Sequence, residues 1–259
     1  MRTGGLLATI RRTALARAPL LGTAAWCYLM LRRQARAMRR AGGDRRTPAE
    51  LLASVPSGTV MLAPDGHELS DPRVIVAPVQ AIQRREELIE LLERVRALAP
   101  RRICEIGAAS GGTLYFLTRA AAPDARIVSL DIDTPPHIAF LRSNLAAPGQ
   151  AVVSLEGDSQ TREMVARVRG EAGGPLDFLF IDGDHSYEGV KRDFELYSPL
   201  VRPDGLIALH DINPDSGGAD GRISGEVPRF WEELSRTHRV EAIVKAPPGA
   251  GLGIGLVHV

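Results

Sequence analysis

Cysteine is scarce in this chain of 259 residues, which contains only Cys27 and Cys104. Cys104 lies in a short apolar run typical of a buried strand, where a small apolar side chain fits. Neither a disulfide framework nor a thiolate metal cluster is therefore expected, and a reducing, cytoplasmic setting is favoured. No internal repeat is visible, and an apolar content of 44% is ordinary for a globular protein.

An apolar run of bilayer length is also lacking. Residues 18–31 form an apolar run of fourteen, whereas a membrane-spanning helix needs about 20 residues. Arginines crowd the far end of this run, so it is no clear signal peptide. Residues 1–46 hold eleven arginines and one acid, while the whole chain has a net charge of +1. A basic N-terminal segment therefore precedes an acidic body.

Three interpretations of this segment remain open. It can be a helix that packs on the following domain or on a second subunit, which would make the protein a homo-oligomer. It can be an interfacial anchor, in which the arginines of residues 11–40 contact lipid phosphates and the protein associates peripherally with a membrane. It can also be a disordered or wrongly assigned start. No nucleic-acid partner is expected.

The second glycine of a dinucleotide-binding fingerprint is missing from the glycine-rich turn that follows an apolar strand at residues 103–106. Ala109 stands at that position between Gly107 and Gly111, which disfavours a nicotinamide cofactor. A helix is expected over 113–122. The turn can still approach a ligand closely, because glycine tolerates unusual backbone angles and a helix N-terminus offers free N–H groups.

Strands and helices alternate from this turn onward, which predicts a doubly wound α/β domain with a mostly parallel sheet. The last two strands are joined by too few residues for a helical crossover, so we expect a C-terminal antiparallel hairpin in a seven-stranded sheet. The expected strands are 103–106, 126–130, 151–155, 176–181, 206–209, 239–245 and 253–259. The expected helices are 83–98, 113–122, 137–145, 161–169, 187–200 and 227–237. We divide the chain into a helical extension (1–46), an irregular linker (47–80) and a catalytic domain (81–259).

Four acids stand at or just after the ends of successive strands, where ligands bind in such a sheet. They are Asp131, Asp158, Asp182 and Asp211. Asp131 is placed to accept hydrogen bonds from ribose hydroxyls. Asp182 and Asp211 end neighbouring strands, so their carboxylates can share a hard divalent cation. His185 follows Asp182 by three residues in a polar turn, and a histidine there can take up a proton near neutral pH.

Residues 103–259 resemble the class I S-adenosylmethionine-dependent methyltransferases. The acid-x-Gly-x-x-x-Gly turn at 105–111 is similar to their first motif, and the strings at 180–190 and 200–211 resemble metal-dependent O-methyltransferases of the catechol type. The resemblance is closer still to the branch that acts on natural-product sugars, beside the cephalosporin-hydroxylase and rhamnosyl O-methyltransferase sequences. Residues 1–80 carry no such resemblance.

The resemblance implies a site. It makes His185 the general base and Asp182 and Asp211 the ligands of Mg²⁺ or Mn²⁺. The residues that it implies at S-adenosylmethionine are Glu105, Gly107, Ser110, Gly111, Thr113, Asp131, Asp158, Ser159, Gln160 and Asp182. The chain departs from the pattern at His210, where the family usually has an acid. This imidazole can be a further ligand, better suited to Mn²⁺ than to Mg²⁺, or it can point into the core.

The expected activity is transfer of a methyl group to a hydroxyl of a small molecule, either a sugar or a phenol. With aromatic residues at only 5% of the chain, a stacked planar acceptor is not favoured over a sugar. Three alternatives stay open: a metal-free methyltransferase that uses His185 alone, a nicotinamide-binding oxidoreductase, and a non-catalytic scaffold whose working part is the basic N-terminus.

Overall fold

The structure, a computed structural model, describes residues 47–53, 61–62, 81–214, 225–247 and 249–259. The predictions for the extension at 1–46, including contact with a membrane surface, lie outside these residues. So does most of the Gly- and Asp-rich loop that follows Asn213. Within the described residues, no helix has the length and apolar character needed to cross a bilayer.

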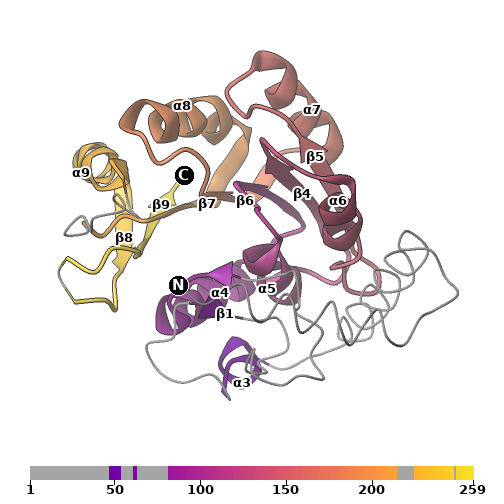
Figure 1. Ribbon diagram of the computed structural model, residues 1–259, viewed down its shortest axis with the longest axis horizontal. Helices are drawn as coiled ribbons and strands as arrows, with labels where there is room; N and C mark the ends of the chain where they lie inside the picture. The colour runs from indigo at the N-terminus through magenta and orange to yellow at the C-terminus, as the bar shows by residue number, and fades with distance from the viewer. Residues whose placement is uncertain (1–46, 54–60, 63–80, 215–224, 248) are drawn as a thin grey trace, which may run out of the picture.

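A sheet of seven strands forms the centre of the molecule (Figure 1). Its spatial order is β5-β4-β3-β6-β7-β9-β8; the first five are parallel, and β9 pairs antiparallel with both β7 and β8. The strands are β3 (Arg102–Ile106), β4 (Arg126–Asp131), β5 (Ala151–Glu156), β6 (Leu176–Ile181), β7 (Val201–His210), β8 (Arg239–Ile243) and β9 (Ile254–His258). The predicted fold class, with its C-terminal hairpin, is confirmed.

Helices cover both faces of this sheet because alternate residues of each strand point to opposite sides. Phe178 and Phe180 of β6 belong to one apolar cluster, and Leu179 and Ile181 belong to the other. The first cluster is covered by α4 (Arg85–Leu98), α5 (Gly112–Ala120) and α6 (Pro136–Ser143). The second is covered by α7 (Arg162–Ala172), α8 (Tyr187–Tyr197) and α9 (Val227–Thr237).

Several predicted boundaries differ from the observed ones by two residues or more, and two of these differences have a local cause. The strand expected at 206–209 is longer, because β7 begins at Val201. Residues 202–205 form a bulge within it, where the register with β6 shifts. The helix expected to reach Leu200 ends at Tyr197 and continues as a 3-10 turn, Ser198–Leu200. Pro199 explains this end, because proline lacks the N–H that would donate to the Glu195 carbonyl and continue the α-helix.

The segment before the domain contains more regular structure than expected. The short helix α3 (Pro48–Leu51) is capped by Thr47, whose side chain accepts from the backbone amide of Glu50. Within the predicted irregular linker, β1 (Met61–Leu62) pairs antiparallel with β2 (Ala81–Ile82). Strand β2 leads directly into α4 and so fixes where that helix begins relative to the sheet.

Candidate active site

The glycine-rich turn and the acid after β6 are in contact at the carboxyl end of the sheet. Strands β3 and β6 are neighbours, and the amide of Asp182 donates to the carbonyl of Ile106 at 2.9 Å. Gly107 has a φ of +83°, and a Cβ atom built there would lie 1.9 Å from the carbonyl oxygen of Asp182. Glycine is therefore required at 107. The strand order reverses between β3 and β6, and such a point is where open α/β sheets bind ligands.

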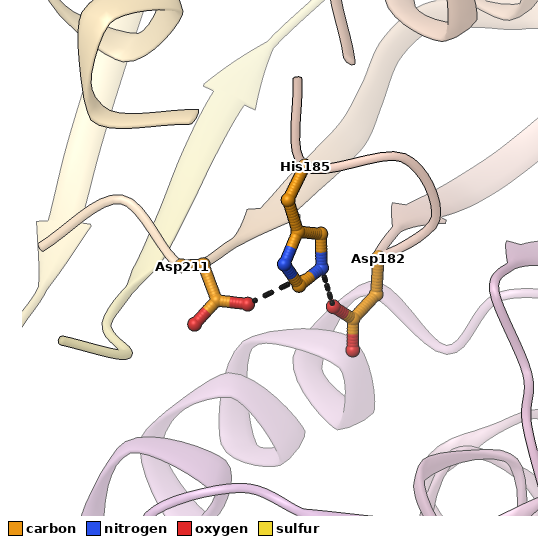
Figure 2. A group of neighbouring side chains, drawn as sticks. All are labelled: Asp182, His185 and Asp211. Atoms are coloured by element: carbon orange, nitrogen blue, oxygen red, sulfur yellow. Dashed lines mark ion pairs between the residues drawn. The ribbon is translucent and has the colours of Figure 1, made fainter. Parts of the chain in front are cut away.

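Asp182, His185 and Asp211 converge at this end (Figure 2). The Nε2 atom of His185 lies 3.5 Å from Oδ1 of Asp182 and 3.5 Å from Oδ2 of Asp211. One donor atom from each residue can be chosen so that all lie within 4.8 Å of one another. The His185 side chain is 35% exposed and that of Asp211 only 2%. The histidine therefore faces the solvent side of a carboxylate pair that is more deeply placed.

His210 lies behind the same two carboxylates. Its Nδ1 atom is 3.2 Å from Oδ1 of Asp182 and 3.0 Å from Oδ2 of Asp211. Burial alone would lower the pKa of His210, but the two carboxylates outweigh burial and raise this pKa to about 10. In turn, the two histidines overcome the effect of burial on Asp182 and hold the pKa of its carboxyl below the usual value. The ring thus touches the acids instead of turning away into the core.

The backbone of Asp211 adopts a left-handed conformation, with φ of +63°. Such a residue is uncommon outside glycine and persists only where the surroundings hold it. Here the next two amides pair with the loop before β9: Ile212 donates to Gly253 at 3.3 Å and Asn213 to Leu252 at 2.7 Å. The buried Glu87 of α4 accepts from the Gly253 amide at 3.1 Å, so α4 supports the segment that presents Asp211.

Asp131 closes the glycine-rich turn from the end of β4. Its Oδ2 accepts from the amide of Ala109 at 2.6 Å. The buried guanidinium of Arg142 lies 3.4 Å from the same oxygen and donates through the same nitrogen to the carbonyl of Ala109. The turn ends at Gly111, the N-cap of α5, with φ of +90°. Thr113 is buried in the first turn of that helix.

Glu105 precedes this turn on β3 and is 1% exposed. Burial is the main reason that its pKa rises to about 8; Asp182 adds to the rise and Arg142 opposes it. Its Oε2 atom has no hydrogen-bond partner in the part of the chain that the structure describes. A buried acceptor without a donor costs about 1–3 kcal/mol, and this is the oxygen that a bound cationic group would satisfy.

Ser159 lies in the turn after β5, next to Asp158 and Gln160, and α8 holds it in two ways. Its hydroxyl donates to Oδ1 of Asp193 at 2.7 Å, and its carbonyl accepts from the Tyr197 hydroxyl at 2.9 Å. The backbone amide of Gln160 donates to Oδ1 of Asp158 at 2.8 Å. The turn expected at the adenine ring is thus held in place by helix α8.

Two residues of this region were missed by the sequence analysis. Arg142 falls on the apolar stripe of α6, four residues after Ile138 and three before Leu145; a charge on such a stripe is the signal that could have found it. Glu226 gives no such signal. Its amide donates to the carbonyl of His185 at 2.8 Å, a contact between segments far apart in sequence.

A family model described as "Methyltransferase domain" matches residues 104–212, which runs from β3 through Asp211. Residues 104–212 are therefore similar to a methyltransferase domain. This confirms the resemblance on which the cofactor prediction depended.

Among relatives of this methyltransferase domain, a catechol O-methyltransferase of Mycobacterium tuberculosis is 36% identical over 90 residues, which are 34% of this chain and 38% of that protein. Two solved structures share the fold. The O-methyltransferase TomG of Streptomyces achromogenes, involved in tomaymycin synthesis and solved with S-adenosylmethionine, has a TM-score of 0.53 and 23% identity, covering 69% of this chain and 81% of its own. An O-methyltransferase of Bacillus cereus, solved with S-adenosylhomocysteine, has a TM-score of 0.51 and 21% sequence identity, and the match covers 88% of this chain and 91% of that one. The chain spans less than two thirds of the length of the curated relatives it matches.

The donor set of this domain fits a divalent cation. Two carboxylates and one imidazole are ligands that Mg²⁺ or Mn²⁺ accepts. In addition, Oδ1 of Asp211 is buried and has no hydrogen-bond partner among the described residues. The group of neighbouring donors contains His185 and not His210, so the prediction that His210 is a ligand stays a prediction, as do the other roles implied for single residues.

Proposed function

We propose that this protein is an S-adenosylmethionine-dependent O-methyltransferase that acts on a hydroxyl of a small molecule, with a divalent cation at Asp182 and Asp211 and with His185 as general base. The observation that carries the proposal is the position of His185 Nε2, 3.5 Å from one oxygen of each carboxylate. A hydroxyl placed between the two acids would therefore lie within reach of the base.

The sulfonium methyl group is already electrophilic, so the domain has to align an oxygen with it and remove a proton. A bound Mg²⁺ or Mn²⁺ would supply Lewis acidity that lowers the pKa of an acceptor hydroxyl. His185 accepts the proton at Nε2. Asp131 orients the ribose, and the turn at 107–111 lets the backbone approach the cofactor. Holding both reactants in one crevice supplies much of the acceleration, because the reaction becomes effectively unimolecular.

The proposal is tested by transfer of label from S-adenosylmethionine to a panel of sugar and phenolic hydroxyls, after chelator treatment and again with added Mg²⁺ or Mn²⁺. We expect transfer that the chelator abolishes and the metal restores. If no binding of S-adenosylhomocysteine is detected by calorimetry, the cofactor assignment is wrong and the scaffold alternative is favoured.

A matched pair of variants tests the cation site itself. Asp211 and Asp204 both lie on the β7 segment with φ of +63°, a conformation that asparagine tolerates as well as aspartate. Asp211→Asn should lose Mn²⁺ binding in calorimetry and about 100-fold in turnover, as for other lost electrostatic contacts. Asp204→Asn, exposed at the opposite end of the strand, should change neither. If the two variants have the same Mn²⁺ affinity and turnover, Asp211 does not bind the cation.

One observation favours a metal-free methyltransferase as the second candidate. The His210 ring lies within 3.2 Å of both carboxylates, so an imidazolium there can balance their charge without a metal. Turnover that survives complete chelation, together with no calorimetric signal for Mn²⁺, would decide for this candidate. The oxidoreductase alternative is disfavoured, since the sheet ends in an antiparallel hairpin.

A further inference from the structure

Gln83, just before α4, reaches Asp182 at the carboxyl end of the sheet from outside the methyltransferase motifs. It is 1% exposed, and its Nε2 donates to Oδ2 of Asp182 at 3.4 Å. A carboxylate accepts hydrogen bonds and does not donate them, so the amide nitrogen has to face Asp182. The amide oxygen Oε1 therefore points away from the acid. This oxygen is buried and has no hydrogen-bond partner in the described part of the chain.

A second acceptor without a donor, Oε2 of Glu105, belongs to the same group of side chains. Glu105 is buried at the end of β3, and Asp182 is the charged residue that acts on it most strongly. Two buried oxygens around one carboxylate therefore lack donors among the described residues. Each unpaired acceptor costs about 1–3 kcal/mol in a folded protein. Such a pair at the carboxyl end of the sheet indicates a ligand that brings N–H groups and positive charge.

We propose that Gln83 binds the α-ammonium group of the methionine end of the cofactor, accepting one of its hydrogen bonds at Oε1 while Glu105 accepts another. This inference rests on the proposed function. An ammonium group has three donors and one positive charge, which match two unpaired oxygens near two acids. The sulfonium has no N–H group, and the cofactor carboxylate would be repelled by Asp182. The adenine is expected at Ser159, after β5.

The choice of glutamine has a physical reason. Its amide can donate to Asp182 and accept from the ligand at the same time, which a carboxylate cannot do without a proton. A third acid beside Glu105 and Asp182 would add like-charge repulsion in a buried place. Gln83 therefore adds an acceptor for the ammonium group and holds Asp182 in position without adding charge.

Calorimetry with two ligands tests this role: S-adenosylhomocysteine, which keeps the ammonium group, and its analogue without the α-amino group. Gln83→Met removes the amide but keeps a long unbranched side chain. We expect it to weaken binding of S-adenosylhomocysteine about 10-fold, as for one lost hydrogen bond to a charged group. Binding of the deamino analogue should change less than about twofold, because only the ammonium contact is lost.

Gln160→Met is the matched control, since Gln160 is expected at the adenine end and any loss there should be equal for both ligands. Gln83→Asn, which shortens the amide by one methylene, is the second variant and should also lose affinity selectively for the ligand with the ammonium group. Equal losses for both ligands in the Gln83 variants would overturn this assignment and leave the proposed function intact. If the wild-type protein binds neither ligand, the proposed function fails first.

Discussion

Gly225 lies against the backbone of His185. It has a φ of +54°, and a Cβ atom built on it would lie 2.4 Å from the carbonyl oxygen of His185 and 2.8 Å from its Cβ. The next residue, Glu226, donates its amide to that same carbonyl at 2.8 Å. The proposed base is therefore held from the side of α9, by a segment that enters the site only through the tertiary fold.

We expect Gly225→Ala to lower turnover about 10- to 100-fold, because the new methyl group displaces His185 and small misplacements of reacting groups are costly. Affinity for S-adenosylhomocysteine should change little, since the cofactor turn is elsewhere. Steady-state kinetics and calorimetry on the same preparation measure the two effects. The control is Gly170→Ala on α7, where a Cβ atom would meet nothing within 4 Å in the described structure. A fall in cofactor affinity that matches the fall in turnover would contradict a role confined to the base.

We expect His185→Ala to reduce turnover about 10²- to 10⁴-fold, the usual contribution of a positioned general base. Mn²⁺ and S-adenosylhomocysteine should still bind with wild-type affinity. Mn²⁺ affinity separates the role of base from that of metal ligand, both of which the position of Nε2 between the two acids allows. If His185 were a ligand, the substitution would weaken Mn²⁺ binding. His258→Ala, at the end of β9, serves as the control substitution. Loss of Mn²⁺ affinity in His185→Ala would make His185 a metal ligand instead of the base.

We expect Arg142→Lys to weaken cofactor binding about 10-fold. Lysine keeps the charge near Asp131, but its single ammonium group cannot contact both the Ala109 carbonyl and the Thr134 hydroxyl, which the two ends of the planar guanidinium hold. Removing the charge altogether, as in Arg142→Met, should also lower the free energy of unfolding by about 3–5 kcal/mol, because buried acids lose their partner. Calorimetry and thermal melts follow the two quantities. Arg167→Lys, exposed on α7, should alter neither. Unchanged cofactor affinity in Arg142→Lys would mean that the turn keeps its shape without the fork.

The buried Asp193 should make stability depend on pH. Burial raises its pKa to about 6; the Ser159 hydroxyl opposes the rise, and Asp184 and Asp158 add to it. Cys104 and Tyr197 also face this carboxyl. Between about pH 4 and pH 6 the unfolded chain has already lost this proton while the folded chain keeps it. The contribution to stability is therefore lost as the pH rises through this window, and it stays lost above pH 6.

We expect Asp193→Asn to remove this dependence. The difference in unfolding free energy between variant and wild type should move in favour of the variant by about 2 kcal/mol from pH 4 to pH 7. Asparagine can still accept from Ser159, and any constant cost of the new amide cancels in a comparison across pH. Chemical denaturation at several pH values measures this difference in unfolding free energy. A difference that does not vary with pH would show that Asp193 is ionised in both states.

Local patterns were sufficient for most of the fold. Short apolar runs followed by small or acidic residues located the parallel strands, and the six residues of β6 are all buried and, apart from Asp177, all apolar. The turn at 107–111 was recognised because glycine and small residues are needed wherever the backbone folds tightly. The wrong boundaries at Val201 and Tyr197 depend on pairing with a neighbour and on Pro199.

The sequence by itself determined that a glycine-rich bend and a series of acids stand at strand ends, because hydrophobic periodicity and turn chemistry are local properties. Only the tertiary structure decided which side chains meet there. Gln83 contacts Asp182 across 99 residues of sequence, Gly225 presses on His185, and His210 turns to the carboxylates instead of the core. Such contacts follow from how strands are ordered and helices are packed, and these depend on the whole chain at once.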